Sequence, residues 1–218
     1  MNMIDAKYEL INEEKVIVEK INTLEKMARE ELVGDTSLTF IDLHMWSAID
    51  KSLKLIDSFL FAFEQQNITV LAALTRMQMD CVLRTYAGTL VADGEEFCKR
   101  VLCDNIRINR VKDLQDKQLT DKYLCESLGA VLRLPLYELY QKVSGYVHLS
   151  SSSFHNITKP EGKNGFTMVI SKKNRDEELE SYKRLSLELA NHFYYFGKIL
   201  ITVCLRSWIE QKKAENLD

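Results

Sequence analysis

Glycine and proline are scarce in this chain, and this scarcity most limits the folds open to it. Only eight glycines and two prolines occur in 218 residues, so the backbone has few positions at which to turn sharply between short strands. Long helices are favoured, and a β-sandwich or barrel is disfavoured. Because 46% of the residues are hydrophobic, a single domain over residues 1–218 can bury a substantial core.

Apolar residues recur at helical spacing through most of the chain. In the Glu- and Lys-rich segment 4–32, Ile17, Ile21, Leu24 and Ala28 form one apolar stripe, which predicts a long amphipathic helix. The same patterns, read with their breaks, predict further helices at about 40–66, 68–92, 95–105, 121–131, 136–148 and 174–211.

Between the last two predicted helices the composition changes. Turn-forming residues lie between the apolar segments 154–158 and 166–170, a pattern typical of a short β-hairpin. The expected fold class is therefore all-α. The expected architecture is an up-and-down helical bundle of about five to seven helices, with a small β-hairpin insertion near 154–170.

Charge and hydropathy suggest a cytoplasmic protein with no membrane contact. The N-terminus is polar and does not resemble a signal peptide. The most apolar stretch, 193–209, contains Lys198 and Arg206 and is shorter than the roughly 20 apolar residues of a membrane span, so we expect a core helix there. The net charge of −3 gives no overall basic excess for nucleic acid, although a local groove could still be basic.

No cofactor or metal site is expected. The five cysteines are odd in number and lack zinc-ligand spacing, so they are interpreted as free, mostly buried thiols. His44, His155 and His192 are interpreted as structural, since no two histidines have the spacing of a helical metal pair.

Three charged residues stand on one face of the apolar helix at 68–92. Arg76, Asp80 and Arg84 are spaced by four residues, which places them one above another on a helix. Charges on a mostly buried helix must be paired or must face a cavity. This charged ladder is therefore a candidate site.

A polar stripe ends the helix predicted at 136–148. Tyr140, Ser144 and His148 are each four residues apart. A serine nucleophile is disfavoured, because no G-x-S-x-G elbow is present and no third residue orients His148. In the structural interpretation, Ser144 and Gly145 allow close helix packing and His148 caps the helix.

The alternative is a non-covalent anion site. In it, His148 and the serine-rich loop with Ser150 and Ser151 converge with the charged ladder on a ligand such as a phosphate. His148, Arg76 and Arg84 would be the catalytic candidates. The ligand-binding candidates would be Asp80, Tyr140, Ser144, Ser150 and Ser151.

The helix end Tyr140-x-x-x-Ser144-x-x-x-His148, with the Arg76-x-x-x-Asp80 helix about sixty residues upstream, resembles a group of uncharacterised bacterial helical-bundle proteins compared with the HEPN superfamily. The resemblance covers roughly 71–153 and implies a helical bundle in a bacterial defence context. Active HEPN proteins are metal-independent ribonucleases marked by an Arg followed after four to six residues by a His. That mark is missing here, since seven residues separate Arg184 from His192.

Three functions follow from these patterns. The first is a component of a bacterial defence or toxin-antitoxin-like system that acts through protein or RNA binding, as a homo-oligomer or with a partner protein. The second is a metal-independent ribonuclease with an atypical HEPN-like site that uses His148 and an arginine of the Arg76/Arg84 pair. The third is a purely structural or interaction module.

Overall fold

The computed structural model describes residues 3–31, 38–148, 158–161, 165–168 and 179–209, and its fold is helical, which confirms the all-α prediction. The helices are α1 (Met3–Glu31), α2 (Phe40–Lys54), α3 (Ile56–Glu64), α4 (Ile68–Gly88), α5 (Gly94–Cys103), the 3-10 turn η1 (Ile108–Arg110), α6 (Asp121–Leu132), α7 (Leu136–Val147), α9 (Leu179–Ile199) and the π-helical segment η3 (Leu200–Leu205).

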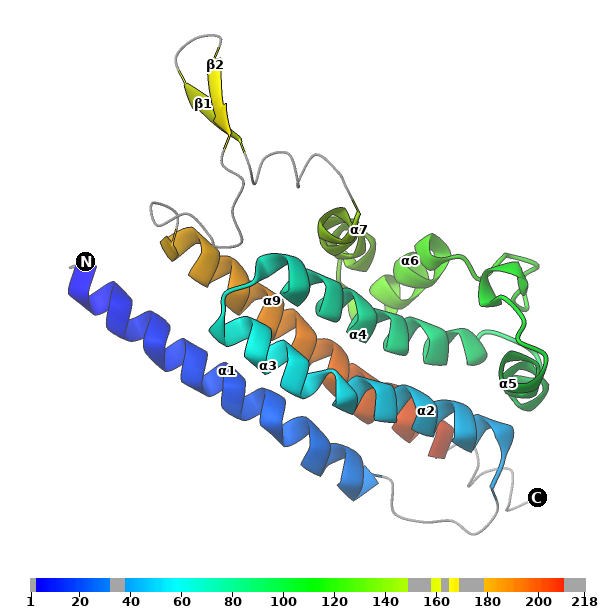
Figure 1. Cartoon of the computed structure of the whole chain (residues 1–218). Coiled ribbons are helices and arrows are strands. Elements are labelled where there is room, and N and C mark those ends of the chain that lie inside the picture. Colours follow the sequence, from blue (N-terminus) through cyan, green and yellow to red (C-terminus); the bar gives the residue numbers. More distant parts are fainter. Residues whose placement is uncertain (1–2, 32–37, 149–157, 162–164, 169–178, 210–218) are drawn as a thin grey trace.

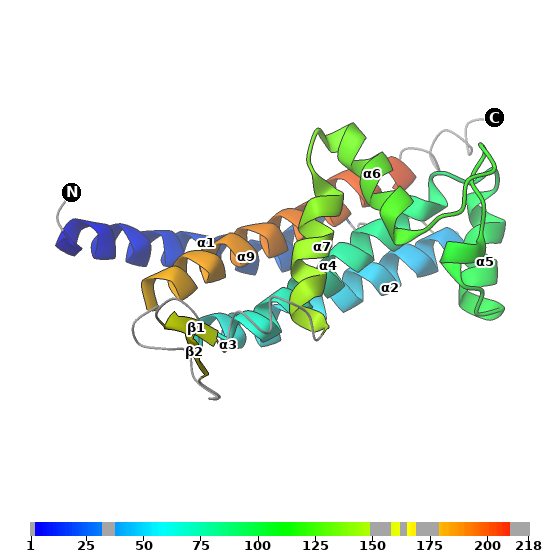
Figure 2. The ribbon, with the colours of Figure 1, turned by 90° about the horizontal axis from the view of Figure 1, so that it is seen from above.

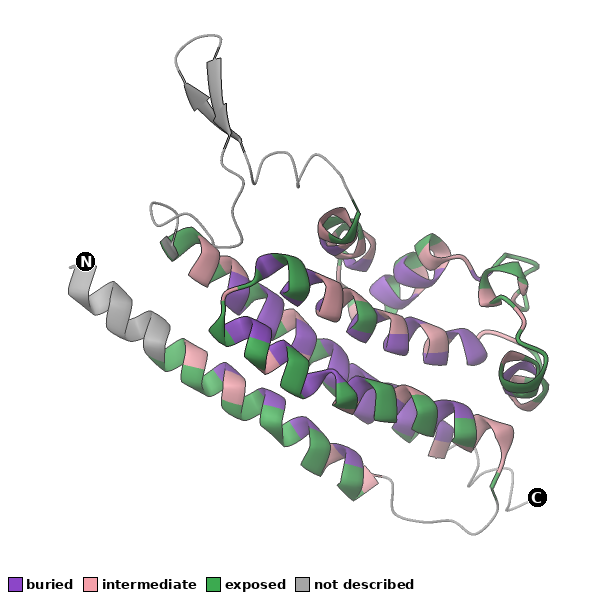
Figure 3. Ribbon diagram, in the orientation of Figure 1, coloured by how far each residue is buried: buried purple, intermediate pink, exposed green. Residues whose placement is uncertain are grey.

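The long helices α1, α2 with α3, α4 and α9 run beside one another along the molecule (Figure 1). Their facing sides form the hydrophobic core, where purple ribbon is concentrated in Figure 3. Phe59 of α3 and Phe193 of α9 are both fully buried and stack with ring centroids 4.1 Å apart. Phe193 of α9 therefore belongs to the hydrophobic core of the bundle.

The helix predicted at 40–66 is divided at Leu55 into α2 and α3. Helix α2 starts in a capping box, in which the Thr39 side chain and Asp42 each accept from the other's backbone N–H. The Glu95 carboxylate of α5 accepts from the N–H groups of Phe40 (2.8 Å) and Ile41 (3.1 Å). A negative charge at a helix N-terminus is favourable, so this contact fixes α5 against α2.

Helix α7 departs from the predicted up-and-down arrangement. It is seen almost end-on in Figure 1 and runs across α4 in Figure 2. The turn before it is tight: Arg133 has a positive φ of 56°, and a Cβ on Gly129 would lie 2.6 Å from the Leu134 carbonyl oxygen. Pro135 then precedes the first helical residue. The crossing places the polar stripe of α7 over the charged ladder of α4.

The apolar stretch 193–209 is a core segment, as predicted, with Phe193, Phe196, Leu200 and Trp208 buried. Gly197 permits the closest approach, because a Cβ there would lie 2.7 Å from side-chain atoms of both Leu24 and Gln78. Within the residues that the structure describes, no helix combines the length and apolarity needed to cross a membrane.

Two short strands occur in the region where the hairpin is expected. β1 (Thr158–Glu161) and β2 (Gly165–Met168) pair antiparallel, from Thr158 opposite Met168 to Glu161 opposite Gly165. The rest of the region 154–170 lies outside the described residues.

Candidate functional site

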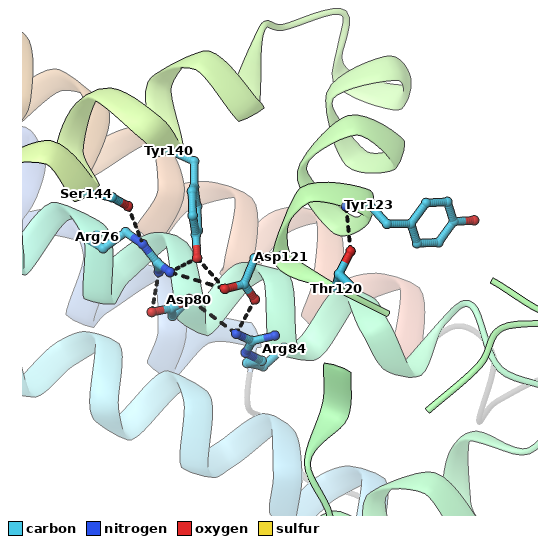
Figure 4. A network of polar contacts seen from close by, with 8 residues as sticks. All are labelled: Arg76, Asp80, Arg84, Thr120, Asp121, Tyr123, Tyr140 and Ser144. Atoms are coloured by element: carbon cyan, nitrogen blue, oxygen red, sulfur yellow. Dashed lines mark hydrogen bonds and ion pairs between the residues drawn. The ribbon is translucent and has the colours of Figure 1, made fainter. Parts of the chain in front are cut away.

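The charged ladder of α4 faces α6 and α7 (Figure 4). The side chains of Arg76, Asp80 and Arg84 are 16%, 27% and 30% exposed, so they are partly withdrawn from solvent. Asp80 lies between the two arginines: it contacts Nη1 of Arg76, and its Oδ1 is 3.8 Å from Nη2 of Arg84. The predicted spacing on one helical face is therefore confirmed.

A second carboxylate, that of Asp121, completes this cluster from α6. Arg84 Nη2 donates to Asp121 Oδ1 at 2.5 Å, and Arg76 Nη2 lies 3.6 Å from Asp121 Oδ2. Two guanidinium groups are thus balanced by two carboxylates. We call Arg76, Asp80, Arg84 and Asp121, together with Tyr140 and Ser144, the ion-pair cluster.

Helix α7 contributes the two polar residues of its stripe to this cluster. Ser144 Oγ accepts from Arg76 Nε at 3.1 Å. The Tyr140 hydroxyl donates to Asp121 and accepts from Arg76, while the guanidinium carbon of Arg76 lies 3.6 Å from the centroid of the Tyr140 ring. The structure therefore brings Tyr140 and Ser144 together with Arg76, as the sequence predicts.

Asp121 was absent from the predicted site residues. It is the first residue of α6, directly after Thr120, whose side chain caps the helix by accepting from the Tyr123 N–H at 3.3 Å. Sequence spacing gives no link between α6 and α4. The available signal was the charge imbalance of the ladder, since two arginines and one aspartate on a buried face require another anion.

His148 lies at the C-terminal end of the polar stripe. It is the C-cap residue of α7, is exposed, and donates its backbone N–H to the Ser144 carbonyl at 3.1 Å. Ser150 and Ser151 lie outside the described residues. The convergence of these three residues with Arg76 and Arg84 on an anion remains a prediction.

The chemistry open to the ion-pair cluster follows from its charge balance. An anionic ligand at Arg76 or Arg84 would have to displace a carboxylate, and each carboxylate bridges both arginines. Breaking a partly buried pair leaves an uncompensated charge, which costs several kcal/mol when the pair is well buried. The cluster is therefore better suited to holding α6 and α7 on α4 than to exchanging ligands.

The histidine at position 44 supports the structural interpretation made from the sequence. His44 is buried and its Nε2 donates to the Arg84 carbonyl at 3.3 Å. Burial lowers the pKa of His44, with the hydrogen bond acting in the opposite direction. Burial thus favours the neutral imidazole in the fold. His155 lies outside the described residues.

All five cysteines are free thiols, as predicted; Cys103 is exposed, and the other four are buried. Burial raises the pKa of Cys98 and Cys125 to about 12, and of Cys81 and Cys204 to about 11. Among the described residues, no group of three or more His, Cys, Asp or Glu side chains is arranged to hold a metal ion.

A second candidate site lies where α5 leads into η1. A cleft of about 660 Å³ is lined by Arg100, Asn105, Ile106, Arg107, Arg110, Val111 and Lys112. We call it the basic cleft. No carboxylate is among these lining residues. All four cationic residues are exposed.

The arginines of the basic cleft differ from those of the ion-pair cluster in their surroundings. Lys112 forms an exposed ion pair with Asp116 at 2.7 Å. In the part of the chain that the structure describes, Arg100, Arg107 and Arg110 form no side-chain ion pair. Their guanidinium groups are available to an anion from solvent.

The sequence prediction overlooked this cleft. The stretch 106–121 is polar and contains charges of both signs. Arg107, Arg110 and Lys112 are close in sequence, and the available signal was this local excess of positive charge. These three residues lie near Arg100 because the chain turns back after α5, where the Ile106 N–H donates to the Arg100 carbonyl at 3.4 Å.

Comparisons of the chain with protein-family models, with curated proteins and with solved structures find no match. The HEPN-like resemblance therefore remains a prediction from the helix-end pattern.

Proposed function

We propose that this chain is a binding module that takes RNA in its basic cleft. One observation carries the proposal: four cationic side chains line a cleft that has no carboxylate in its lining, and three of them form no ion pair within the described residues. Arginine offers a planar fork of donors that suits phosphate oxygens. The chain as a whole has a formal net charge of −3, so the residues outside this cationic cleft are net negative and a polyanion would be directed to the cleft.

The ion-pair cluster has a different role in this proposal. It joins α4, α6 and α7 through Arg84, Asp121 and Tyr140. Helix α6 begins at Asp121, nine positions after Lys112, the last lining residue of the basic cleft. Because α6 is held against α4, the C-terminal end of the segment that leads from the basic cleft into α6 is held in place. The cluster thus supports the binding surface without contacting the ligand.

The resemblance to HEPN-like proteins adds a biological context. We propose that RNA binding is the way in which the chain acts as a component of a bacterial defence or toxin-antitoxin-like system. The ribonuclease alternative is not adopted, because Arg76 and Arg84 each contact two carboxylates. Assembly as a homo-oligomer or with a partner protein is a separate prediction, and the mass of the particle in solution tests it.

The binding experiment uses fluorescence anisotropy with an end-labelled single-stranded RNA at several salt concentrations. Contacts with four phosphates predict a slope of log K against log salt of about −3, since each contact on a single strand contributes about −0.7. The charge-reversal variant Arg107→Glu/Arg110→Glu should weaken binding about tenfold or more and flatten this slope.

A matched control is Lys51→Glu/Lys198→Glu, which changes the net charge equally at exposed positions on α2 and α9. It should alter affinity by no more than about twofold. Equal weakening by both variants, or no binding by the wild type at low salt, would overturn the proposal. Polyglutamate of matched charge serves as a competitor, and displacement of RNA at equal charge concentration would reassign the cleft to acidic polypeptides.

A further inference from the structure

A second cavity lies away from both sites, between α1, the start of α7 and α9. It measures about 490 Å³ and is lined by Lys20, Leu134, Pro135, Leu136, Leu139, Asn191, His192, Tyr194, Tyr195 and Phe196. This size and this mixture of apolar walls with a few polar groups are typical of small-molecule sites. We call it the α9 cavity.

The walls of the α9 cavity are held in place by the core. Leu136 and Phe196 are 2% and 1% exposed. The preceding turn is fixed by Gly129, whose carbonyl accepts from the Leu134 N–H at 2.9 Å. The cavity is therefore formed before any ligand binds, which reduces the ordering that binding requires.

His192, one of the lining residues of this cavity, has an unsatisfied polar atom. Its Nδ1 is buried and has no hydrogen-bond partner within the described residues. Asn191 is already used, since its side-chain amide donates to the Leu187 carbonyl at 3.0 Å. A buried polar atom without a partner costs about 1 to 3 kcal/mol. A ligand that bonds to Nδ1 would recover part of that free energy.

Lys20 supplies a positive charge to the same cavity. Its side chain is exposed, and it forms no ion pair within the described part of the chain. Glu188 and Lys142, which lie close enough to His192 to influence it, are paired with each other at 2.6 Å. The charge that remains uncompensated in the lining is that of Lys20.

We propose that the α9 cavity binds a small carboxylic acid with an apolar body. The apolar part lies among Leu136, Leu139 and Phe196, and the carboxylate meets the Lys20 ammonium. One carboxylate oxygen can also accept from a ring N–H of His192. The proposal is independent of RNA binding, because none of these residues lines the basic cleft.

Three probes of equal chain length separate the contribution of the head group from that of the apolar body. Decanoate, decan-1-ol and decylamine are titrated into the full chain by calorimetry at neutral pH. We expect decanoate to bind most tightly and decylamine least. Similar affinities for all three, or no binding by decanoate, would overturn the proposal.

Two variants locate the binding. Lys20→Met keeps a side chain of similar length without the charge. It should weaken the affinity for decanoate about tenfold, which corresponds to the loss of one charge-assisted hydrogen bond, and leave the affinity for decan-1-ol unchanged. Leu139→Trp fills the cavity and should abolish binding of both probes, with circular dichroism to verify folding. The control Lys198→Met removes an exposed charge of α9 outside the cavity and should bind as the wild type; an equal loss in this control would contradict the assignment.

Discussion

The guanidinium of Arg84 donates to the carboxylate of Asp121 at 2.5 Å, across 37 positions of sequence. The contact joins the core helix α4 to the first turn of α6. Because Asp121 also contacts Arg76 and Tyr140, it ties α4, α6 and α7 together. Its removal is therefore the most direct test of what the ion-pair cluster does.

We expect Asp121→Asn to lower the free energy of unfolding by about 1 to 3 kcal/mol, because two partly buried arginines would then share one carboxylate. Urea denaturation measures the change. Asp116→Asn is the matched control, since Asp116 pairs with Lys112 in an exposed contact and should lose less than about 1 kcal/mol. Equal stability of Asp121→Asn and the wild type would show that the cluster contributes nothing to folding.

The ribonuclease hypothesis makes a separate prediction. If Arg76 and Arg84 are held by Asp80 and Asp121, His148 has no free arginine of this pair to assist it. We expect wild type and His148→Ala to behave alike with structured RNA in the presence of a chelator, as measured on denaturing gels. Cleavage by the wild type that is lost in His148→Ala would restore the nuclease assignment.

Stability should fall as the solution becomes acidic, partly because of His44. Its pKa in the fold lies below the ordinary value of 6.5 through burial, so the unfolded chain binds the proton more readily. The contribution of neutral His44 to the free energy of unfolding is complete above pH 6.5. It is lost as the pH falls through the pKa of His44 in the folded state.

His44→Gln tests this dependence, because glutamine can donate to the Arg84 carbonyl and does not titrate. Denaturation at a series of pH values between about 5 and 7 should show a smaller loss of stability for the variant than for the wild type. Superimposable profiles would exclude a contribution from His44. His192, whose pKa is also lowered mainly by burial, should retain its own share in both proteins.

Thiol reactivity should distinguish Cys103 from the other cysteines. Burial raises the pKa of Cys81, Cys98, Cys125 and Cys204 to about 11 or 12, whereas Cys103 is exposed. Since the thiolate is the reactive form, Ellman's reagent at neutral pH should label one thiol quickly in the native chain and all five after denaturation. A native Cys103→Ser variant that still reacts quickly would contradict the burial of the other four.

Much of the local structure could be predicted from the sequence. The stripe of Ile17, Ile21, Leu24 and Ala28 predicts the buried face of α1, and all four residues are at most 2% exposed. The spacing of Arg76, Asp80 and Arg84 places them on one face because helical periodicity is a local property. The break at Leu55 was missed, since neither glycine nor proline marks it.

The residue pattern alone predicts the helices, their buried faces and the need for a partner to the charges on α4. The identity of that partner depends on how the helices pack. Asp121 reaches Arg84 because α6 packs against α4, and α7 lays Tyr140 and Ser144 over Arg76 because it crosses that helix. Helical spacing relates residues within a few turns, whereas these contacts depend on turns such as the one at Arg133 and on close packing between helices.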